Sequence, residues 1–219
     1  MQIILGLLDF ILHIDVHLGQ IISSYGLITY LILFGIIFIE TGIVFMPFLP
    51  GDSLLFAAGA FAALGSLNIF VIIGLLIAAA VLGDTSNYWI GHFFGEKLIA
   101  NPKVPINKEH IEETKRFFAK YGAKTIVLAR FVPIVRTFAP FVAGVGKMHY
   151  KTFFSYNVIG GVAWVLIASL AGYFFGNIGW VKENFSVIII VIILISVIPM
   201  MIPLIKKLLR KFKKKVEKI

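Results

Sequence analysis

The sequence predicts an all-α, polytopic membrane protein with about four transmembrane helices and two opposed re-entrant helical segments in an inverted repeat. Of its 219 residues, 59% are hydrophobic and 14% are charged, against roughly 45–50% apolar and about 25% charged in soluble domains. Long uncharged runs alternate with two apolar stretches that proline and glycine interrupt. A chain of this length has too small an interior to hide so much apolar surface, which excludes a soluble globular protein.

The N-terminal segment 1–20 is predicted to be an amphipathic helix at the membrane interface. Four polar side chains follow one another at helical spacing: Asp9, His13, His17 and Gln20. A buried helix is the alternative, and the pattern suits an interfacial helix better than a cleaved signal because a basic start and a small-residue cleavage site are missing. The uncharged run 21–39 is long enough to span the bilayer and ends at Glu40.

A broken segment follows the first span. Pro47 and Pro50 each remove a backbone donor and disfavour helix in the preceding residue. The apolar stretch 54–64 is too short to cross a bilayer. We therefore predict a re-entrant segment that breaks at Pro50-Gly51-Asp52. Non-helical backbone at membrane depth needs protein or water around it, which predicts a cavity near Asp52.

The next span, 70–94, carries Asp84 and leads into the long polar stretch 96–124. Asn107 is a plausible N-cap and Gly122 a plausible stop for a helix in this stretch. Three residues form the apolar face of that helix: Ile111, Phe118 and Tyr121. This pattern predicts an amphipathic helix on the membrane surface.

The second broken segment covers 129–146. Its prolines, Pro133 and Pro140, and its arginines, Arg130 and Arg136, argue against a simple spanning helix. Two further spans are predicted at 153–176 and 185–205. The chain then forms one membrane domain with a tail: 1–20 interfacial helix, 21–95 first repeat, 96–124 cytoplasmic amphipathic loop, 125–205 second repeat (together the domain 1–205), and 206–219 basic cytoplasmic tail.

Basic residues set the expected orientation. Eight of them, with one glutamate, lie between Lys206 and Lys218, and together with the polar loop they place both termini in the cytoplasm. On that topology the first broken segment enters from outside and the second from inside. The tail should contact anionic lipid, and nucleic acid is excluded as a partner because the chain has no soluble basic module.

The two halves also resemble each other weakly. Residues 88–95 and 169–176 both end a span and both finish in Phe-Phe-Gly. Interrupted segments at corresponding places of inverted halves are a sequence signature of a transporter's central site. The glycine pairs Gly91/Gly95 and Gly172/Gly176 are better explained by close helix packing.

Five ionisable residues lie in or beside apolar segments: Glu40, Asp52, Asp84, Arg130 and Arg136. Each would cost roughly 2.5–3.5 kcal/mol at a helix centre, so each needs a partner or water. One interpretation is that they are static ion pairs that hold the broken segments together. For Asp84 the alternative is hydrogen bonding by Asn87 and Tyr88 one turn later.

The functional interpretation is an anionic substrate with a proton relay. Pro133 would let the chain bring Arg130 and Arg136 into one cavity, and guanidinium binds phosphate bidentately. Glu40 and Asp52 can titrate, so proton loading can be coupled to occupancy.

Other chemistry is excluded by the residues. The chain has no cysteine, His13/His17 lacks the remaining ligands of a metal site, and no nucleotide-binding or hydrolase motif is present. The sequence therefore predicts no metal, no cofactor and no enzymatic activity.

At these charged positions the sequence resembles the DedA family of bacterial membrane proteins, which is related to eukaryotic VTT-domain scramblases. The matching motifs occur in order: Glu40, Pro47–Asp52, Gly83–Gly91, Arg130–Arg136, Ala143-Gly144, Phe154–Asn157, Gly160 and Trp164. The resemblance implies membrane-embedded acids at Glu40 and Asp52 and essential arginines at Arg130 and Arg136. It implies supporting roles for a second group: Asp84, Pro50, Gly51, Pro133 and Asn157. It also implies transport of lipids such as undecaprenyl phosphate or phosphatidylethanolamine.

The sequence thus predicts a proton-coupled lipid transporter in which Arg130 and Arg136 bind the phosphate headgroup. A proton-coupled small-ion antiporter and a lipid-phosphate enzyme are the alternatives, and a static scaffold would leave the five charges unexplained. The lipid species, the direction of transport and the formation of a homo-oligomer stay open.

Overall fold

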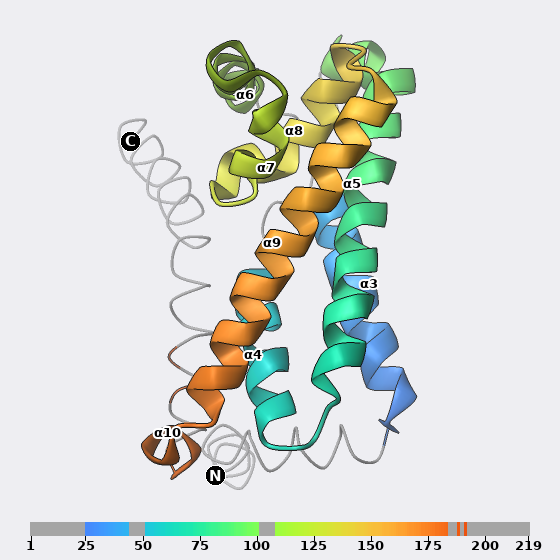
Figure 1. The fold of residues 1–219 in the computed structure, drawn as a ribbon. Coiled ribbons are helices and arrows are strands. Elements are labelled where there is room, and N and C mark those ends of the chain that lie inside the picture. Colours follow the sequence, from blue (N-terminus) through green and yellow to red (C-terminus); the bar gives the residue numbers. More distant parts are fainter. Residues whose placement is uncertain (1–24, 44–50, 101–107, 184–187, 189–190, 192–219) are drawn as a thin grey trace, which may run out of the picture.

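The computed structural model describes residues 25–43, 51–100, 108–183, 188 and 191 (Figure 1). Within these ranges the chain is helical and has no strand, which confirms the all-α class. The helices are α3 (Leu27–Gly42), α4 (Gly51–Ala63), α5 (Ile69–Ala100), α6 (Lys108–Tyr121), the short 3-10 helix η1 (Gly122–Lys124), α7 (Thr125–Ala129), α8 (Pro133–Val145), α9 (Tyr150–Gly176) and α10 (Gly179–Glu183). Several predicted features lie outside the described residues: the 1–20 helix, Pro47, Pro50, most of the 185–205 span and the 206–219 tail.

Among the described helices, α5 and α9 are long and apolar enough to cross a membrane. Their 32 and 27 residues correspond to about 48 and 40 Å of helix, more than the roughly 30 Å of a hydrocarbon core. They run past each other along the length of the molecule (Figure 1). The predicted spans at 70–94 and 153–176 are therefore helices, and each extends further than the apolar run.

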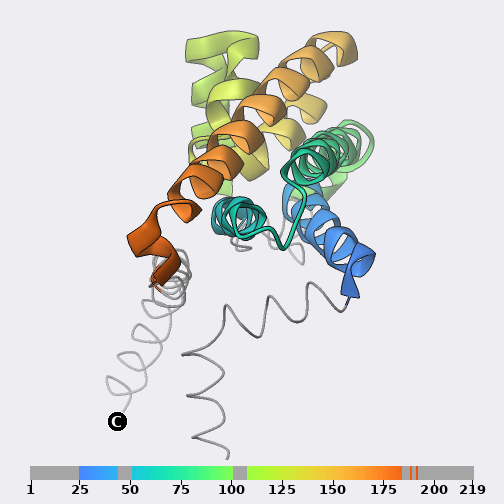
Figure 2. The ribbon, with the colours of Figure 1, turned by 60° about the horizontal axis from the view of Figure 1, so that its bottom comes forward.

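The two interrupted segments occupy opposite halves of the molecule. In Figure 1, α4 lies in the lower half, whereas α7 and α8 lie in the upper half. Figure 2 looks down α4 and shows it between α9 on one side and α3 with α5 on the other. In the second segment the helix is interrupted at residues 130–132, and Pro133 begins α8. Pro140 lies inside α8 and does not end it.

Glycines allow the short helices to approach the long ones closely. A Cβ on Gly91 of α5 would overlap the carbonyl oxygen of Phe141 in α8, and a Cβ on Gly172 of α9 would overlap that of Phe56 in α4. Gly95 and Gly176, one turn further along, make the next contacts of the same two pairs. The packing interpretation of these glycines is confirmed, and each short helix packs on a long helix of the other half of the chain.

The amphipathic helix α6 packs on the protein itself. Ile111 is buried, and it clusters with Phe138, Phe141 and the half-buried Phe118. The apolar face that was expected to rest on the membrane is therefore largely covered by α8. The predicted stop is confirmed, because Gly122 adopts φ +56° directly after α6.

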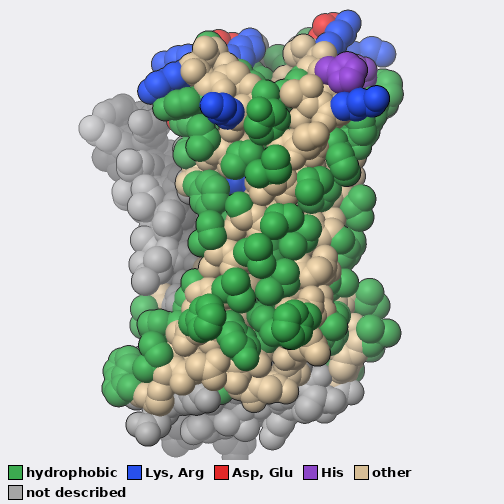
Figure 3. Space-filling view, viewed as in Figure 1, with side chains coloured by type: hydrophobic (Ala, Val, Ile, Leu, Met, Phe, Trp, Pro, Cys, Tyr) green, Lys and Arg blue, Asp and Glu red, His purple; other side chains and the backbone are tan. Residues whose placement is uncertain are grey.

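Charged side chains gather at one end of the face that Figure 3 displays. They cover α6 and the start of α9, and the remaining length of that face is mostly hydrophobic. A long apolar surface with a charged end is the pattern of a helical membrane protein.

Candidate functional site

The first half of the site is an ion-pair cluster around Arg136 on α8. Its Nη2 donates to Glu40 Oε1 at 2.6 Å, and its Nη1 donates to Asp52 Oδ1 at 2.9 Å. Glu40 comes from the last turn of α3 and Asp52 from the first turn of α4, so three separate helices meet at one guanidinium. Arg136 and Glu40 are buried, whereas the side chain of Asp52 is 61% exposed. The cluster therefore opens to its surroundings at Asp52.

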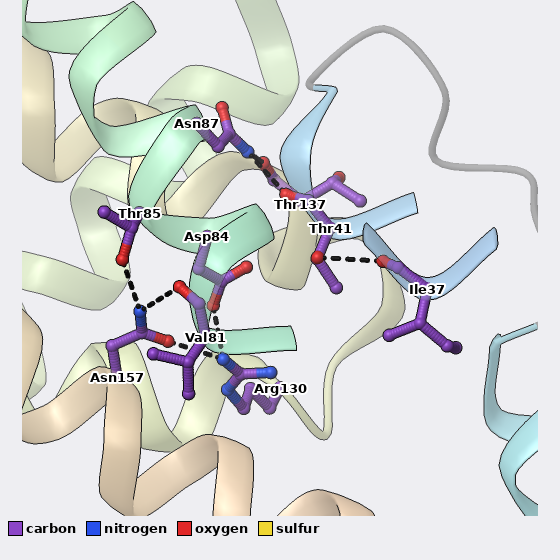
Figure 4. A network of polar contacts seen from close by, with 9 residues as sticks. All are labelled: Ile37, Thr41, Val81, Asp84, Thr85, Asn87, Arg130, Thr137 and Asn157. Carbon is purple, nitrogen blue, oxygen red and sulfur yellow. Dashed lines mark hydrogen bonds and ion pairs between the residues drawn. The ribbon is translucent and has the colours of Figure 1, made fainter. Parts of the chain in front are cut away.

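The second half of the site surrounds Arg130, in the turn between α7 and α8 (Figure 4). Its Nη2 donates to Asp84 Oδ2 on α5 and to Asn157 Oδ1 on α9, both at 2.6 Å. Asn157 in turn donates to the carbonyl oxygen of Val81 at 3.0 Å. Arg130, Asp84 and Asn157 are all buried, so this cluster is enclosed, whereas the cluster around Arg136 is open at Asp52.

Trp164 of α9 joins the two clusters. Its ring centroid lies 5.7 Å from the guanidinium carbon of Arg130 and 5.0 Å from that of Arg136, within cation–π range. Its Nε1 donates to Asp52 Oδ1 at 2.6 Å. Trp164 was not among the predicted site residues. The signal was present, because a buried indole N–H in an apolar span needs an acceptor.

Local sequence explains how Glu40 and Arg130 find room. A Cβ on Gly51 would overlap the Glu40 carboxylate, so only glycine lets that carboxylate rest against the start of α4. A helix N-terminus also favours a negative charge. On α9, a Cβ on Gly160 would lie 3.1 Å from the Arg130 side chain. Gly51 and Gly160 therefore leave the space that the Glu40 and Arg130 side chains occupy.

We expect Gly51→Ala to destabilise the protein by roughly 1–3 kcal/mol, because its methyl group displaces the buried Glu40 carboxylate. Thermal unfolding in detergent measures the loss. Gly74→Ala is the matched control, since Gly74 lies in α5 with open space around it. Alanine is preferred there by about 1 kcal/mol, so the control should hold or gain stability. A similar melting temperature for both variants would contradict the role of Gly51.

The two clusters together carry a net charge of −1 when all five groups are ionised. Despite their ion pairs, the arginines keep spare hydrogen-bond donors. Nε and Nη1 of Arg130 and Nε of Arg136 are buried and have no partner among the described residues. Buried polar groups in native proteins are nearly always hydrogen-bonded. The site can therefore accept a further hydrogen-bond acceptor, such as an oxyanion.

The structure shows where the two arginines lie and which side chain pairs with Asp84. Both arginines lie beside one indole, each on its own carboxylate partners. The suggestion that Asn87 and Tyr88 satisfy Asp84 is wrong: Asn87 donates to backbone carbonyls and the Tyr88 hydroxyl donates to the carbonyl of Met148. Both side chains bond to backbone outside α5, and Asp84 accepts a hydrogen bond from Arg130.

A cavity of about 360 Å³ lies between α5, α6 and α8, and none of the five charged site residues lines it. Its lining includes Ile99, Lys115, Phe118 and Val142. Near Asp52, where a cavity was predicted, the structure shows a carboxylate that is 61% exposed.

Comparison with known proteins places the chain in a family. The VTT domain model matches residues 49–174. Protein DedA of Escherichia coli (strain K12) is 54% identical over 193 residues, which cover 87% of this chain and 88% of that protein. An uncharacterized membrane protein of Mycobacterium tuberculosis (strain ATCC 25618 / H37Rv) is 46% identical over 158 residues, 71% of this chain and 69% of that protein.

A more distant relative is the inner membrane protein YghB of Escherichia coli (strain K12), 30% identical over 177 residues, 80% of this chain and 78% of that protein. No solved structure gives a significant match. The relatives are named as membrane or inner membrane proteins, in agreement with the two apolar helices. The chain is therefore a membrane protein and belongs to the DedA family of VTT-domain proteins.

Proposed function

We propose that the protein is a proton-coupled flippase or scramblase in the cytoplasmic membrane. It moves a lipid with a phosphate headgroup between leaflets, either undecaprenyl phosphate or a glycerophospholipid such as phosphatidylethanolamine. The observation that carries the proposal is a pair of buried guanidinium groups with spare N–H donors, beside one indole and open at Asp52.

The proposed architecture has four transmembrane helices and two re-entrant segments, one around α4 and one around α7 and α8. Equivalent packing supports this arrangement, because α4 lies on α9 and α8 lies on α5 through glycines 81 residues apart. The charged end in Figure 3 is assigned to the cytoplasm, together with the basic tail, which would contact anionic lipid. Protein inserted from each side would then meet at the charged site.

Protonation sets the affinity of the site for phosphate. With a net charge of −1 the clusters repel an anion. Protonating Asp52 or Glu40 makes the net charge zero, and protonating both makes it +1. Each proton also frees an Arg136 N–H that was donating to a carboxylate. Asp52 is the exposed member, so we place proton entry there.

In the site, hydrogen bonds from the arginines replace the water that hydrates the phosphate headgroup. Burying a bare phosphate is prohibitive unless charge-assisted hydrogen bonds replace its hydration. Arg136 can supply the donors that protonation releases, and Arg130 has unpartnered Nε and Nη1. The acyl or prenyl tail remains in the bilayer while the headgroup passes. This division suits a lipid better than a free ion.

The experiment reconstitutes the purified protein in vesicles with labelled undecaprenyl phosphate or labelled phosphatidylethanolamine in one leaflet. We expect faster exchange between leaflets than in protein-free vesicles, with a rate that changes with pH. Glu112→Gln is the control, because Glu112 pairs with Lys115 on the exposed face of α6. No acceleration for either lipid would contradict the proposal.

The same vesicles test the rivals. The buried acids would also suit a proton-coupled ion antiporter, for which pH-dependent cation flux without lipid movement is expected. Release of inorganic phosphate from a lipid phosphate would favour an enzyme.

A further inference from the structure

Asn87, in the middle of α5, links the two broken segments. It is fully buried, and its Nδ2 donates to the carbonyl oxygen of Thr41 at 3.2 Å and to that of Thr137 at 2.9 Å. Figure 4 shows the amide nitrogen aimed at both carbonyls. Oδ1 of Asn87 has no partner within the described part of the chain. The side chain therefore acts as a donor through both of its hydrogens.

The two acceptors occupy special positions. Thr41 directly follows Glu40 on α3, and Thr137 directly follows Arg136 on α8. Glu40 and Arg136 form the buried 2.6 Å ion pair of the cluster around Arg136. A single amide on a third helix thus holds the backbone beside each partner of that pair.

Close helix contacts lie one turn on either side of Asn87. A Cβ on Gly83 would overlap Thr41 Oγ1 of α3, and a Cβ on Gly91 would overlap the Phe141 carbonyl of α8. Asn87 therefore lies between the point where α5 meets α3 and the point where α5 meets α8. If α8 moved relative to α3 far enough to separate Glu40 from Arg136, at least one of the two hydrogen bonds of the Asn87 side chain would break.

We propose that Asn87 is a positioning residue that sets the geometry of the Glu40–Arg136 pair. Its two hydrogen bonds hold α3 and α8 at one separation, so that opening the pair also leaves a buried carbonyl without its donor. The proposal concerns the ion pair itself, and it rests on the proposed function only for its effect on transport.

Thermal unfolding of the full chain in detergent tests the positioning role without any transport assay. Asn87→Leu removes both donors and keeps the number of side-chain heavy atoms. It is made in the native chain and in the Glu40→Gln/Arg136→Gln double variant. If Asn87 positions the pair, the fall in Tm is larger in the native chain than in the double variant by at least about 2 °C, because coupled residues are not additive. Equal losses in the two backgrounds would overturn the proposal.

Two further variants keep the test decisive. Ser86→Ala is the matched control, because the Ser86 hydroxyl on the same turn donates to the Leu82 carbonyl of its own helix, on the exposed side of α5. Its effect on Tm should be the same in both backgrounds. If Asn87→Leu does not fold, Asn87→Ser, which keeps one donor, carries the same comparison with a smaller expected difference.

A second readout uses the vesicle assay. We expect Asn87→Leu to shift the pH at which lipid exchange is half-maximal, because the pair that competes with protons is no longer held in place. Ser86→Ala should leave that pH unchanged. A reduced rate with an unchanged pH profile would count against positioning. If the unmodified protein moves no lipid, the proposed function fails, and the Tm comparison still decides the role of Asn87.

Discussion

Arg136→Gln is expected to reduce lipid exchange in reconstituted vesicles by about 100-fold. Arg136 donates to both Glu40 and Asp52, and it is the arginine nearest the exposed carboxylate. Glutamine removes the charge-assisted donors, each of which contributes about 1.5–3 kcal/mol, and it leaves two carboxylates that repel phosphate. The rate of exchange of labelled undecaprenyl phosphate between leaflets measures the effect.

Two other variants show whether the loss in Arg136→Gln depends on the guanidinium group and on its place in the site. Arg136→Lys keeps the charge and loses the planar fork, so it should retain only part of the activity. Arg116→Gln is the control, because Arg116 lies on α6 and donates to the Glu112 carbonyl of the same helix on its exposed side. Native flux in Arg136→Gln would remove this arginine from the mechanism. An equal loss in Arg116→Gln would show that the effect is not specific to the site.

Asp84→Ala is expected to cause the largest loss of stability among these variants. Asp84 and Arg130 form a 2.6 Å pair in which both side chains are almost fully buried. Removing one partner of such a pair costs about 3–5 kcal/mol, because the other charge remains buried without compensation. In a chain of this size that loss lowers Tm by roughly 6–20 °C, measured by thermal unfolding in detergent.

The double variant Asp84→Leu/Arg130→Met separates the two interpretations of this pair. Removing both charges should recover much of the stability lost in Asp84→Ala. If the recovered protein exchanges lipid at the native rate, the Asp84–Arg130 pair is a static ion pair. If it is stable and inactive, Arg130 takes part in transport. A double variant less stable than Asp84→Ala would contradict the compensation argument itself.

Much of the fold could be predicted locally. The helices α5 and α9 follow from uncharged runs longer than a bilayer, and the stop at Gly122 follows from glycine's access to positive φ. The start of α8 at Pro133 follows from proline's preference for the first helical turn. The packing of α6 on α8 could not be predicted, because an apolar helix face looks the same in sequence whether lipid or protein covers it.

The sequence predicted which charged residues form the candidate site, and it did not predict how they pair. The five charged residues were identifiable because each is costly in an apolar segment. The sequence did not tell which acid pairs with which arginine, nor did it assign Trp164 and Asn87 to the site. The hydrogen bonds of these residues join positions that are from 46 to 112 residues apart.

The sequence by itself determined that this is a helical membrane protein with two interrupted segments and five charged residues in or beside apolar segments. These features depend on composition and on the local preferences of proline, glycine and ionised side chains, which act within a few residues. Only the tertiary structure decided that Arg130 is enclosed with Asp84 while Arg136 reaches the exposed Asp52. That division depends on how closely glycines let α4 and α8 approach α9 and α5, which is a property of packed helices and not of any one segment.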